Sequence, residues 1–520
     1  MAIVLLASAL FFYKLLKLNL LVSEYMALIG AVLLLFVYVI GVLLFYGVRR
    51  KRSVMRRIRR IIALILAAVL TFGCIYGFVM LTSIEKTMNT IVAKPEENDR
   101  AIVGVYVKKD DPASALGDMA DYTYAVLGEL GNEKINSNYA IAKINEQLNA
   151  EVAVISYPGI TDAAIALRDG EVQALAVNKS FLSLLDETES LKGYADEMKL
   201  IDEIRVPNTA TLENTPIIIG TAVPEPTPEP TPEPTPEPTP EPPVYGEDTT
   251  LVFYLSGVDK WEPGLSNTHS DVNILMLVNT KTRQVLLINT PRDTFLDNPA
   301  IGGGDKLTHC GVQGISNSIA ALEKFYGISV DNYVKSNFAG FESFVNAIGG
   351  IDIDNPIDFT VNIPGHPFHY EVGTIHLNGY AALLYARERH AFGAGDLERG
   401  RNHLRVLTAI INRVKTAGLT LLPEYPKIIE SMGDCFETDL TPEQMSDLVK
   451  IATRYLNEWD IKSYGLIGAS GKRVTASGGS EPLFIIWPKQ YSINFANELM
   501  DMIMNDEIIT DEIIANAPLW

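Results

Sequence analysis

The sequence predicts an α/β protein in three parts: a helical membrane anchor, a smaller α/β module and a larger C-terminal α/β domain. Three observations lead to this prediction. Apolar residues are crowded into the first eighty of the 520 positions. Short β-type runs then alternate with helical patterns on both sides of a proline-rich segment, an alternation typical of α/β folds. The chain is also long enough for two or three domains that each bury a core.

The anchor is predicted from three apolar runs, at residues 3–22, 26–48 and 61–81. Each is close to the ~20 residues that a helix needs to cross a bilayer, so we expect residues 1–85 to hold about three transmembrane helices. The segment 49–60 is rich in arginine and lysine, and the positive-inside rule places it in the cytoplasm. The protein is therefore expected to be a multi-pass protein of the cell membrane whose C-terminal domains are extracellular.

Residues 99–220 are predicted to form the smaller α/β module. Strands are expected at 101–107, 152–155 and 174–177, and helices at 160–168 and 181–185. This texture resembles the extracellular solute-binding fold, in which a lobe presents backbone groups to a small ligand. No catalytic constellation occurs in the module, and a spacer that binds no ligand is an equally good interpretation.

Residues 224–243 form a repeat of Thr-Pro-Glu-Pro. Proline at alternate positions favours polyproline II, so this segment is predicted to be an extended linker to the C-terminal domain, residues 248–506, which a tail at 507–520 follows. The formal net charge of −20 argues against a nucleic-acid-binding face, which would be basic. Three cysteines are too few for a disulfide framework; Cys310 and Cys435 either pair or remain free thiols.

The C-terminal domain mixes strands and helices along the chain. Strands are expected at 250–255, 272–278, 284–288 and 462–466, and helices at 314–325, 338–347, 379–384, 397–416 and 442–457. This order predicts an α/β or α+β sandwich.

Candidate chemistry begins at the ends of the first three strands of this domain. Asp259 comes just after the first strand and Asp271 just before the second. Two carboxylates at strand ends suit a hard divalent cation such as Mg²⁺, although two ordinary turn aspartates are the alternative. Arg292 follows Pro291 at the end of the third strand. Asp293 beside it either orients the guanidinium or acts as a base, a surface ion pair being the alternative.

A second charged cluster lies at residues 383–405, which hold five arginines and two histidines. Arg387 and Arg389 are two residues apart, so an extended segment places both on one face. Asp396 follows a glycine-rich turn at the predicted start of a helix, where a carboxylate suits the dipole. Arg399 and His403 lie three and seven residues further on and share its face.

We expect the two clusters to meet and bind a phosphate or pyrophosphate, because the guanidinium fork takes phosphate oxygens two at a time and stays charged. A solvated run of charges is the alternative. No Gly-x-Ser-x-Gly elbow, P-loop or paired Cys-x-x-Cys occurs, so serine acyl transfer, nucleotide-triphosphate use and structural zinc lack support. His366, His369 and His376 have no spacing typical of a metal site.

Six motifs occur in a fixed order: Gly-Val-Asp at 257–259, Ser-Asp at 270–271, Pro-Arg-Asp-Thr at 291–294, Gly-Gly-Ile-Asp-Ile at 349–353, Leu-Asn-Gly-Tyr-Ala-Ala-Leu at 377–383, and Arg-x-Arg with Gly-Asp-x-x-Arg at 387–399. This ordered set, which covers about 251–407, resembles the LytR-CpsA-Psr family. The resemblance implies an α-β-α sandwich and an extracellular, membrane-anchored phosphotransferase. Such an enzyme moves a glycopolymer, of the teichoic acid or capsular polysaccharide type, from a polyprenyl-pyrophosphate carrier to peptidoglycan.

The resemblance also implies roles for the residues above. Mg²⁺ would be held by Asp259 and Asp271. The pyrophosphate would be bound by Arg292, Arg387, Arg389 and Arg399, with Asp396 orienting the arginines and Asp293 the candidate proton acceptor. Lys306 and His403 complete the candidate substrate-binding residues. Two positions depart from the family pattern: His269 stands where arginine is usual and His403 where glutamine is usual, so the roles of both stay open.

Two alternatives to this function remain. One is a membrane protein of a different class, which binds polyprenyl lipids or solutes for regulation without turnover. The other is a polyprenyl-pyrophosphate hydrolase that uses the same site with water as the acceptor.

Overall fold

A computed structural model of the chain describes residues 1–45, 54–92, 101–128, 131–207, 209–211, 245–246, 248–259, 268–363, 367–393, 395–417, 428, 432–455 and 458–518. The predicted linker at 224–243, the basic residues at 49–52 and His366 lie outside the described residues.

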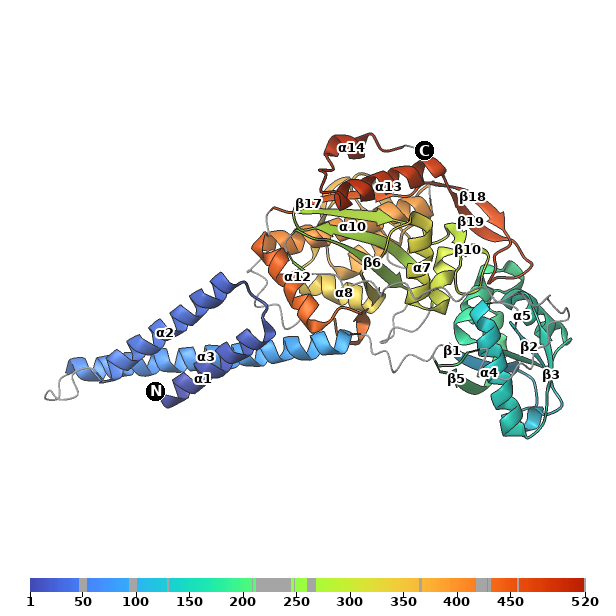
Figure 1. The fold of residues 1–520 in the computed structure, drawn as a ribbon, viewed down its shortest axis with the longest axis horizontal. Helices are drawn as coiled ribbons and strands as arrows, with labels where there is room; N and C mark the ends of the chain where they lie inside the picture. Colours follow the sequence, from blue (N-terminus) through green and yellow to red (C-terminus); the bar gives the residue numbers. More distant parts are fainter. Residues whose placement is uncertain are drawn as a thin grey trace, which may run out of the picture.

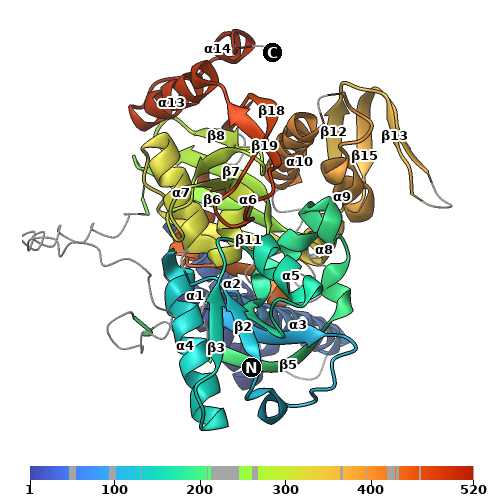
Figure 2. The ribbon, with the colours of Figure 1, turned by 90° about the vertical axis from the view of Figure 1, so that its right-hand side faces the viewer.

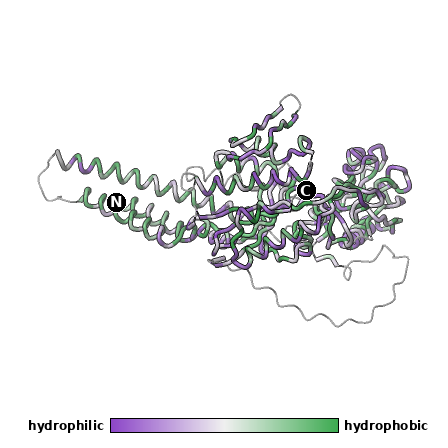
Figure 3. Tube along the Cα trace, turned by 90° about the horizontal axis from the view of Figure 1, so that it is seen from above, coloured by the Kyte–Doolittle hydropathy of each residue, from purple (hydrophilic) through white to green (hydrophobic). Residues whose placement is uncertain are grey.

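The N-terminal part consists of three helices that project from the rest of the molecule (Figure 1): α1 (Ala2–Leu18), α2 (Ser23–Phe45) and α3 (Val54–Ile91). Most of their residues are hydrophobic (Figure 3), and many large apolar side chains, such as Leu34 and Phe72, are exposed. Among the described helices, α2 and residues 57–91 of α3 are long and apolar enough to cross a membrane. The prediction of about three spans is not supported for the first run. Helix α1 has 17 residues and ends at Asn19, which takes the left-handed conformation. It therefore stops short of the ~20 residues of a span.

The small module is a five-stranded sheet in the order β3-β2-β4-β1-β5. The strands are β1 (Ala101–Lys108), β2 (Thr123–Val126), β3 (Ala153–Ser156), β4 (Ala174–Asn178) and β5 (Met198–Val206). Helix α4 (Gly131–Leu148) packs on one face through Ile141 and Ile144. Helix α5 (Ile160–Asp169) and the 3-10 helix η2 (Lys179–Glu187) pack on the other face. The module is therefore a three-layer α/β unit.

The predicted strands β1, β3 and β4 and helix α5 are confirmed, and the expected helix at 181–185 is a 3-10 helix. Sequence reasoning missed α4, β2 and β5. The polar residues of α4 (NEKINSNYAIAKINEQL) dilute its apolar stripe, and β5 alternates too irregularly to stand out. The module also holds three short 3-10 helices, η1 (Leu116–Met119), η3 (Glu189–Leu191) and η4 (Tyr194–Glu197).

The C-terminal domain is built on a six-stranded sheet in the order β16-β11-β6-β7-β8-β17. The strands are β6 (Thr250–Val258), β7 (Ser270–Asn279), β8 (Gln284–Asn289), β11 (Asn332–Asn337), β16 (Phe436–Thr438) and β17 (Asp460–Gly465). The pairs β11–β6 and β8–β17 are parallel, and the other three are antiparallel. Alternate residues of the central strands, such as Leu275 and Ile274, are buried on opposite faces.

Helices cover both faces of this sheet, so the predicted α-β-α sandwich is confirmed. Helices α7 (Ile315–Tyr326) and α13 (Gln490–Met504) pack on one face, and α10 (Asp396–Ala417) packs on the other with α12 (Pro442–Arg454). Helices α8 (Phe338–Ala347) and α9 (Gly379–Arg387) pack with α10 around a separate apolar core. The remaining elements are β9 (Phe295–Asp297), β10 (Gly304–Lys306), α6 (Leu307–Cys310), η5 (Gly311–Gln313), β12 (Ile351–Asn355), β13 (Phe359–Val361), β14 (Phe368–Tyr370), β15 (Gly373–Leu377), η7 (Gly433–Cys435), β18 (Gly468–Arg473), β19 (Leu483–Pro488) and α14 (Asp511–Ala515).

The small module docks against the loop after β18 (Figure 2). The buried Thr161 hydroxyl of α5 donates to the Gly478 carbonyl at 2.6 Å, and the Ser480 amide donates to Asp162 at 3.0 Å. This contact brings η2 close to the sheet of the C-terminal domain. All three cysteines are free thiols.

Candidate active site

Asp259 and Asp271 come together because β6 and β7 are antiparallel neighbours. Val258, the last residue of β6, pairs with Ser270, the first residue of β7. Asp259, which follows β6, and Asp271, the second residue of β7, therefore lie at the same edge of the sheet. Burial, and next the negative charge of Asp271, raise the pKa of Asp259. Two like charges are thus held side by side.

Arg292 reaches the same edge from the end of β8. Strand β8 pairs with β7, and the Thr290 amide donates to the Asn273 carbonyl at 2.9 Å, which aims the following residues at Asp271. Arg292 Nη1 donates to Asp271 Oδ1 at 2.6 Å, and its Nε lies 3.5 Å from Asp293 Oδ2. Burial disfavours the charged guanidinium, but these carboxylates outweigh it and raise the pKa of Arg292.

The prediction that Arg387 lies on an extended segment is wrong. Arg387 is the last residue of α9, and Glu388 after it takes the extended conformation. The helix runs on because its buried face continues through Leu383 and Ala386, and an arginine in the last turn suits the dipole. The Arg387 guanidinium lies 4.3 Å above the ring of Phe338 and 3.4 Å from Asp259 Oδ2.

Helix α10 begins at Asp396, as predicted, and carries the remaining candidates. Arg399 Nη2 lies 3.0 Å from Asp396 Oδ1, and Arg389 Nη1 lies 3.8 Å from the same oxygen. His403 is buried one turn further on. Its burial, and then the charge of Arg399, lower the pKa of His403 to about 3. The imidazole is therefore neutral at physiological pH.

Seven of the ten predicted site residues line one cavity of about 550 Å³. They are Asp259, Asp271, Arg292, Arg387, Arg389, Arg399 and His403. The rest of the lining is largely apolar and comes from α8, α9, α10 and the strands β7, β11 and β16. Its apolar residues include Ile274, Val334, Phe341, Phe344, Leu383, Val406, Ile410 and Phe436. The two arginine clusters thus share a cavity whose largely apolar lining suits a hydrocarbon chain.

Asp293, Lys306 and Asp396 lie outside this lining. Asp293 is 2% exposed, and its carboxylate lies 3.2 Å from Lys306 Nζ. Burial alone would raise its pKa, but Arg292 and Lys306 outweigh burial and lower the pKa of Asp293 to about 2. A carboxylate so stabilised is a weak base, so this environment does not support the predicted role of Asp293 as a proton acceptor, which stays a prediction. Its contacts suit a residue that positions the two cations.

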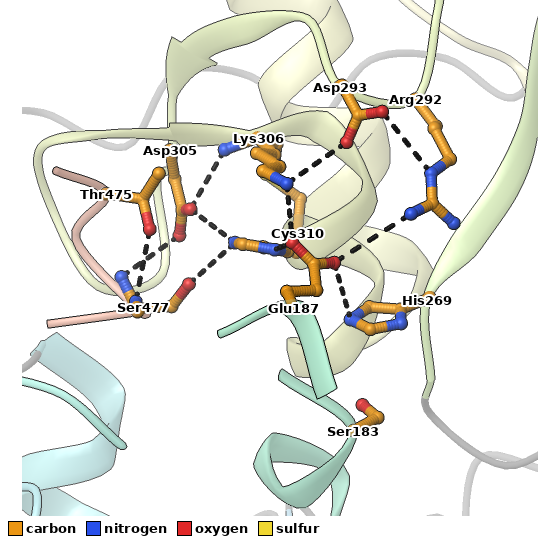
Figure 4. A network of polar contacts seen from close by, with 12 residues as sticks. Ser183, Glu187, His269, Arg292, Asp293, Asp305, Lys306, Cys310, Thr475 and Ser477 are labelled. Carbon is orange, nitrogen blue, oxygen red and sulfur yellow. Dashed lines mark hydrogen bonds and ion pairs between the residues drawn. The ribbon is translucent and has the colours of Figure 1, made fainter. Parts of the chain in front are cut away.

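Sequence reasoning missed a polar network beside Lys306 (Figure 4). His309 of α6 lies at i+4 from Asp305, and its Nδ1 is 2.6 Å from Asp305 Oδ1. Glu187, the last residue of η2 in the small module, lies 2.5 Å from Lys306 Nζ and 3.9 Å from Arg292 Nη2. The spacing of Asp305 and His309 was a usable signal. Glu187 had none, because only the docking of the module brings it here.

The network shifts the titration of its own members. Burial opposes protonation of His309, but Asp305 and Glu187 outweigh it and raise the pKa of His309 to about 9. Burial, and then the neighbouring His309, lower the pKa of His269 to about 4. The two imidazoles therefore differ in charge at neutral pH.

Comparisons with known proteins agree with the motifs. Residues 233–477 match the LytR_cpsA_psr family. Over 197 residues, 38% of this chain and 62% of the relative, the chain is 32% identical to a "Polyisoprenyl-teichoic acid--peptidoglycan teichoic acid transferase TagU" of Bacillus mycoides (strain KBAB4). The protein of the same name from Enterococcus faecalis (strain ATCC 700802 / V583) is 32% identical over 203 residues, 39% of this chain and 64% of that protein.

The chain thus spans less than two thirds of the length of these curated relatives. Among solved structures, the crystal structure of B. subtilis TagV aligns with a TM-score of 0.42 and 22% identity, covering 51% of this chain and 100% of that one.

Proposed function

We propose that this chain, which carries a LytR-CpsA-Psr family domain across residues 233–477, is a membrane-anchored phosphotransferase. It attaches a glycopolymer of the teichoic acid or capsular polysaccharide type, carried on polyprenyl pyrophosphate, to peptidoglycan. The relatives at 32% identity are named as teichoic acid transferases. The observation that carries the proposal is the convergence of Arg292, Arg387, Arg389 and Arg399 on one cavity.

The reaction suits this site. An acceptor hydroxyl of peptidoglycan attacks the phosphorus next to the glycopolymer, a phosphodiester forms, and the bond to the polyprenyl phosphate breaks as the hydroxyl loses its proton. Phosphoryl transfer requires positioning and charge stabilisation more than covalent help. The four guanidinium groups supply both, because they bind the phosphate oxygens and stabilise the leaving polyprenyl phosphate.

The apolar part of the cavity lining supports a polyprenyl donor. Phe436 of β16 belongs to that lining, and Thr438 of the same strand bridges to Val92, which follows α3. The apolar lining is therefore next to the candidate membrane anchor, from which a lipid carrier would enter. We infer that α2 and α3 hold the chain in the cell membrane with segment 49–60 in the cytoplasm and the C-terminal domain outside.

The donor set fits a Mg²⁺ ion held by Asp259 and Asp271. Both carboxylates face the cavity, and the pKa of Asp259 is raised partly by Asp271, a repulsion that a hard dication would relieve. When bound, Mg²⁺ would neutralise negative charge on the pyrophosphate. Asp293 and Lys306 position Arg292 from behind, and Asp396 orients Arg399 and Arg389.

The test uses the full-length protein in detergent with a polyprenyl-pyrophosphate-linked glycopolymer, with and without peptidoglycan. A transferase forms a phosphodiester-linked product and releases polyprenyl phosphate only when the acceptor is present. Equal release without acceptor would identify a hydrolase. Tight binding of the donor without release would identify a binding protein. Either result would overturn the proposal.

A further inference from the structure

A candidate metal site lies at the seam between the small module and the C-terminal domain. Glu187 of η2, His269 before β7 and His309 of α6 place one ligand atom each within 4.8 Å of one another. His269 Nε2 is 3.8 Å from Glu187 Oε1, and His309 Nε2 is 3.4 Å from Glu187 Oε2. Tetrahedral zinc with bonds of ~2.0–2.1 Å separates its ligand atoms by roughly 3.4 Å, so small side-chain adjustments close this set around an ion.

Two of these ligand atoms make no hydrogen bond within the described residues. His269 Nε2 and Glu187 Oε1 are both buried without a hydrogen-bond partner, although buried polar atoms are nearly always paired. They face each other across the space where the metal would lie. Glu187 Oε2 remains available to Lys306 at 2.5 Å. An ion between the three side chains would thus satisfy both atoms that the protein leaves unpaired.

The third ligand is already oriented as metal-binding histidines are. His309 Nδ1 lies 2.6 Å from Asp305 Oδ1 and 2.9 Å from the Ser477 hydroxyl. An imidazole that donates its Nδ1–H to a carboxylate presents Nε2 as a basic ligand, and such carboxylate–histidine pairs usually stand behind metals. His309 is 0% exposed, so this orientation is held rigidly.

The surrounding charges favour a dication. The ion-paired network contains four carboxylates, Glu187, Asp271, Asp293 and Asp305, and two permanent cations, Arg292 and Lys306. In the metal-free protein His309 is also cationic, so one negative charge is left over; a metal that binds at Nε2 displaces the His309 proton, and two negative charges are then left over. A divalent ion removes that excess, and its repulsion from Lys306 and Arg292 is balanced by the carboxylates that already pair with both.

We propose that Glu187, His269 and His309 form a site for Zn²⁺ or a similar first-row dication, separate from the aspartate pair in the cavity. Two imidazoles and one carboxylate suit such an ion, whereas Mg²⁺ prefers oxygen ligands. Because Glu187 belongs to the small module and both histidines belong to the C-terminal domain, the ion ties the two together. It does so directly beside Arg292, so metal occupancy sets how η2 lies against the arginine cluster.

The experiment measures metal binding, which does not depend on the transferase proposal. The untagged full-length protein in detergent is stripped with a chelator, dialysed and titrated with Zn²⁺ for mass-spectrometric metal analysis. It is titrated in parallel with Co²⁺ for electronic absorption. The expected result is one Zn²⁺ per chain and the intense visible bands of four-coordinate Co²⁺. No retained Zn²⁺, or a weak octahedral Co²⁺ spectrum, would overturn the proposal.

Substitutions test which side chains bind the ion. Glu187→Gln keeps the shape of the side chain, and His269→Gln changes a side chain at the edge of the network; each should weaken Zn²⁺ binding by at least 100-fold. Asp305→Asn keeps the shape of the side chain, removes the carboxylate that orients His309, and should weaken Zn²⁺ binding by about 10–100-fold. The matched control is His376→Gln, which changes an exposed histidine that pairs with Asp352; this variant should bind Zn²⁺ as the wild type does.

Two further measurements test whether the Zn²⁺ binds instead at the aspartate pair of the cavity. Asp259→Asn should retain full Zn²⁺ binding, and a large excess of Mg²⁺ should not displace the Zn²⁺. If either removes the metal, or if Glu187→Gln and His269→Gln bind as the wild type does, the ion lies elsewhere and the proposal is wrong. Thermal unfolding of each metal-free variant confirms that it remains folded.

Discussion

Replacing Arg387 by alanine is the sharpest test of the arginine cluster, because the fold contains a close structural match for it. Arg387 pairs with Asp259 and stacks on Phe338 at 4.3 Å. Arg283, at the far end of β8, pairs with Glu458 and stacks on Tyr455 at 4.3 Å. Their side chains are 41% and 38% exposed. They differ in place: Arg387 lines the cavity and Arg283 does not.

The expected cost follows from the exposure of Arg387. A cation ~4 Å from a phosphate oxygen gains about 4 kcal/mol at an effective dielectric constant of 20. Since the guanidinium is 41% exposed, solvent screening reduces this to about 2 kcal/mol. At 1.36 kcal/mol for each factor of ten, Arg387→Ala should lower transfer roughly 30-fold. Arg283→Ala should leave transfer within about twofold of the wild type.

The assay measures phosphodiester formation by full-length protein and follows thermal unfolding alongside. Both variants lose one half-exposed ion pair and one cation–π contact, so both should lose a similar ~0.5–1.5 kcal/mol of stability. Arg387→Lys keeps the charge without the fork and should recover part of the activity. Equal activity loss in Arg387→Ala and Arg283→Ala, or none in Arg387→Ala, would refute the assignment of Arg387 to the pyrophosphate.

Three further predictions concern the parts behind the cavity. Asp293→Asn should lower stability at pH 7 by on the order of 2 kcal/mol. The folded pKa of about 2 lies below the ordinary aspartate value of 3.8, so the difference from wild type in denaturant titrations should shrink as pH falls from 4 towards 2. A pH-independent difference would contradict the ion-pair account. Gly400→Ala should destabilise the fold by about 1–3 kcal/mol and slow transfer, because the new Cβ would lie 2.3 Å from Asn289 Nδ2 and push α10 away from β8. The control is Gly117→Ala, where nothing lies within 4 Å of the new Cβ. Equal melting temperatures for the two variants would show that α10 can shift freely. Removal of divalent ions with a chelator should abolish transfer, and added Mg²⁺ should restore transfer in the wild type but not in Asp271→Asn. Full activity in the presence of the chelator would show that transfer does not need the metal.

Strands β6, β7, β8 and β17 of the C-terminal sheet and the arginine-rich segments could be predicted from local pattern, whereas strands β11 and β16 of the same sheet were missed. Strands β6, β7 and β8 are largely apolar runs, and α10 has a strong polar–apolar periodicity. The spacing of apolar residues was therefore enough to predict where these elements lie. Asp396 at the first turn of α10 was readable for the same reason, since an acid before a helical run signals its start. The backbone of Arg387 was predicted wrongly, because no sequence signal showed that packing against α8 and α10 would carry the α9 helix past Leu384.

The sequence by itself determined that this protein has apolar N-terminal helices, an α/β sheet with acids and arginines at its strand ends, and charge concentrated enough to bind an anion. Only the tertiary structure decided that the two arginine clusters line one cavity, that Asp293 is buried behind it, and that Glu187 reaches His269 and His309 from another module. The physical reason is the sequence separation over which each kind of interaction acts. Periodicity and capping act between residues a few positions apart, whereas helix packing and module docking join residues separated by 82 to 128 positions through contacts that no local pattern encodes.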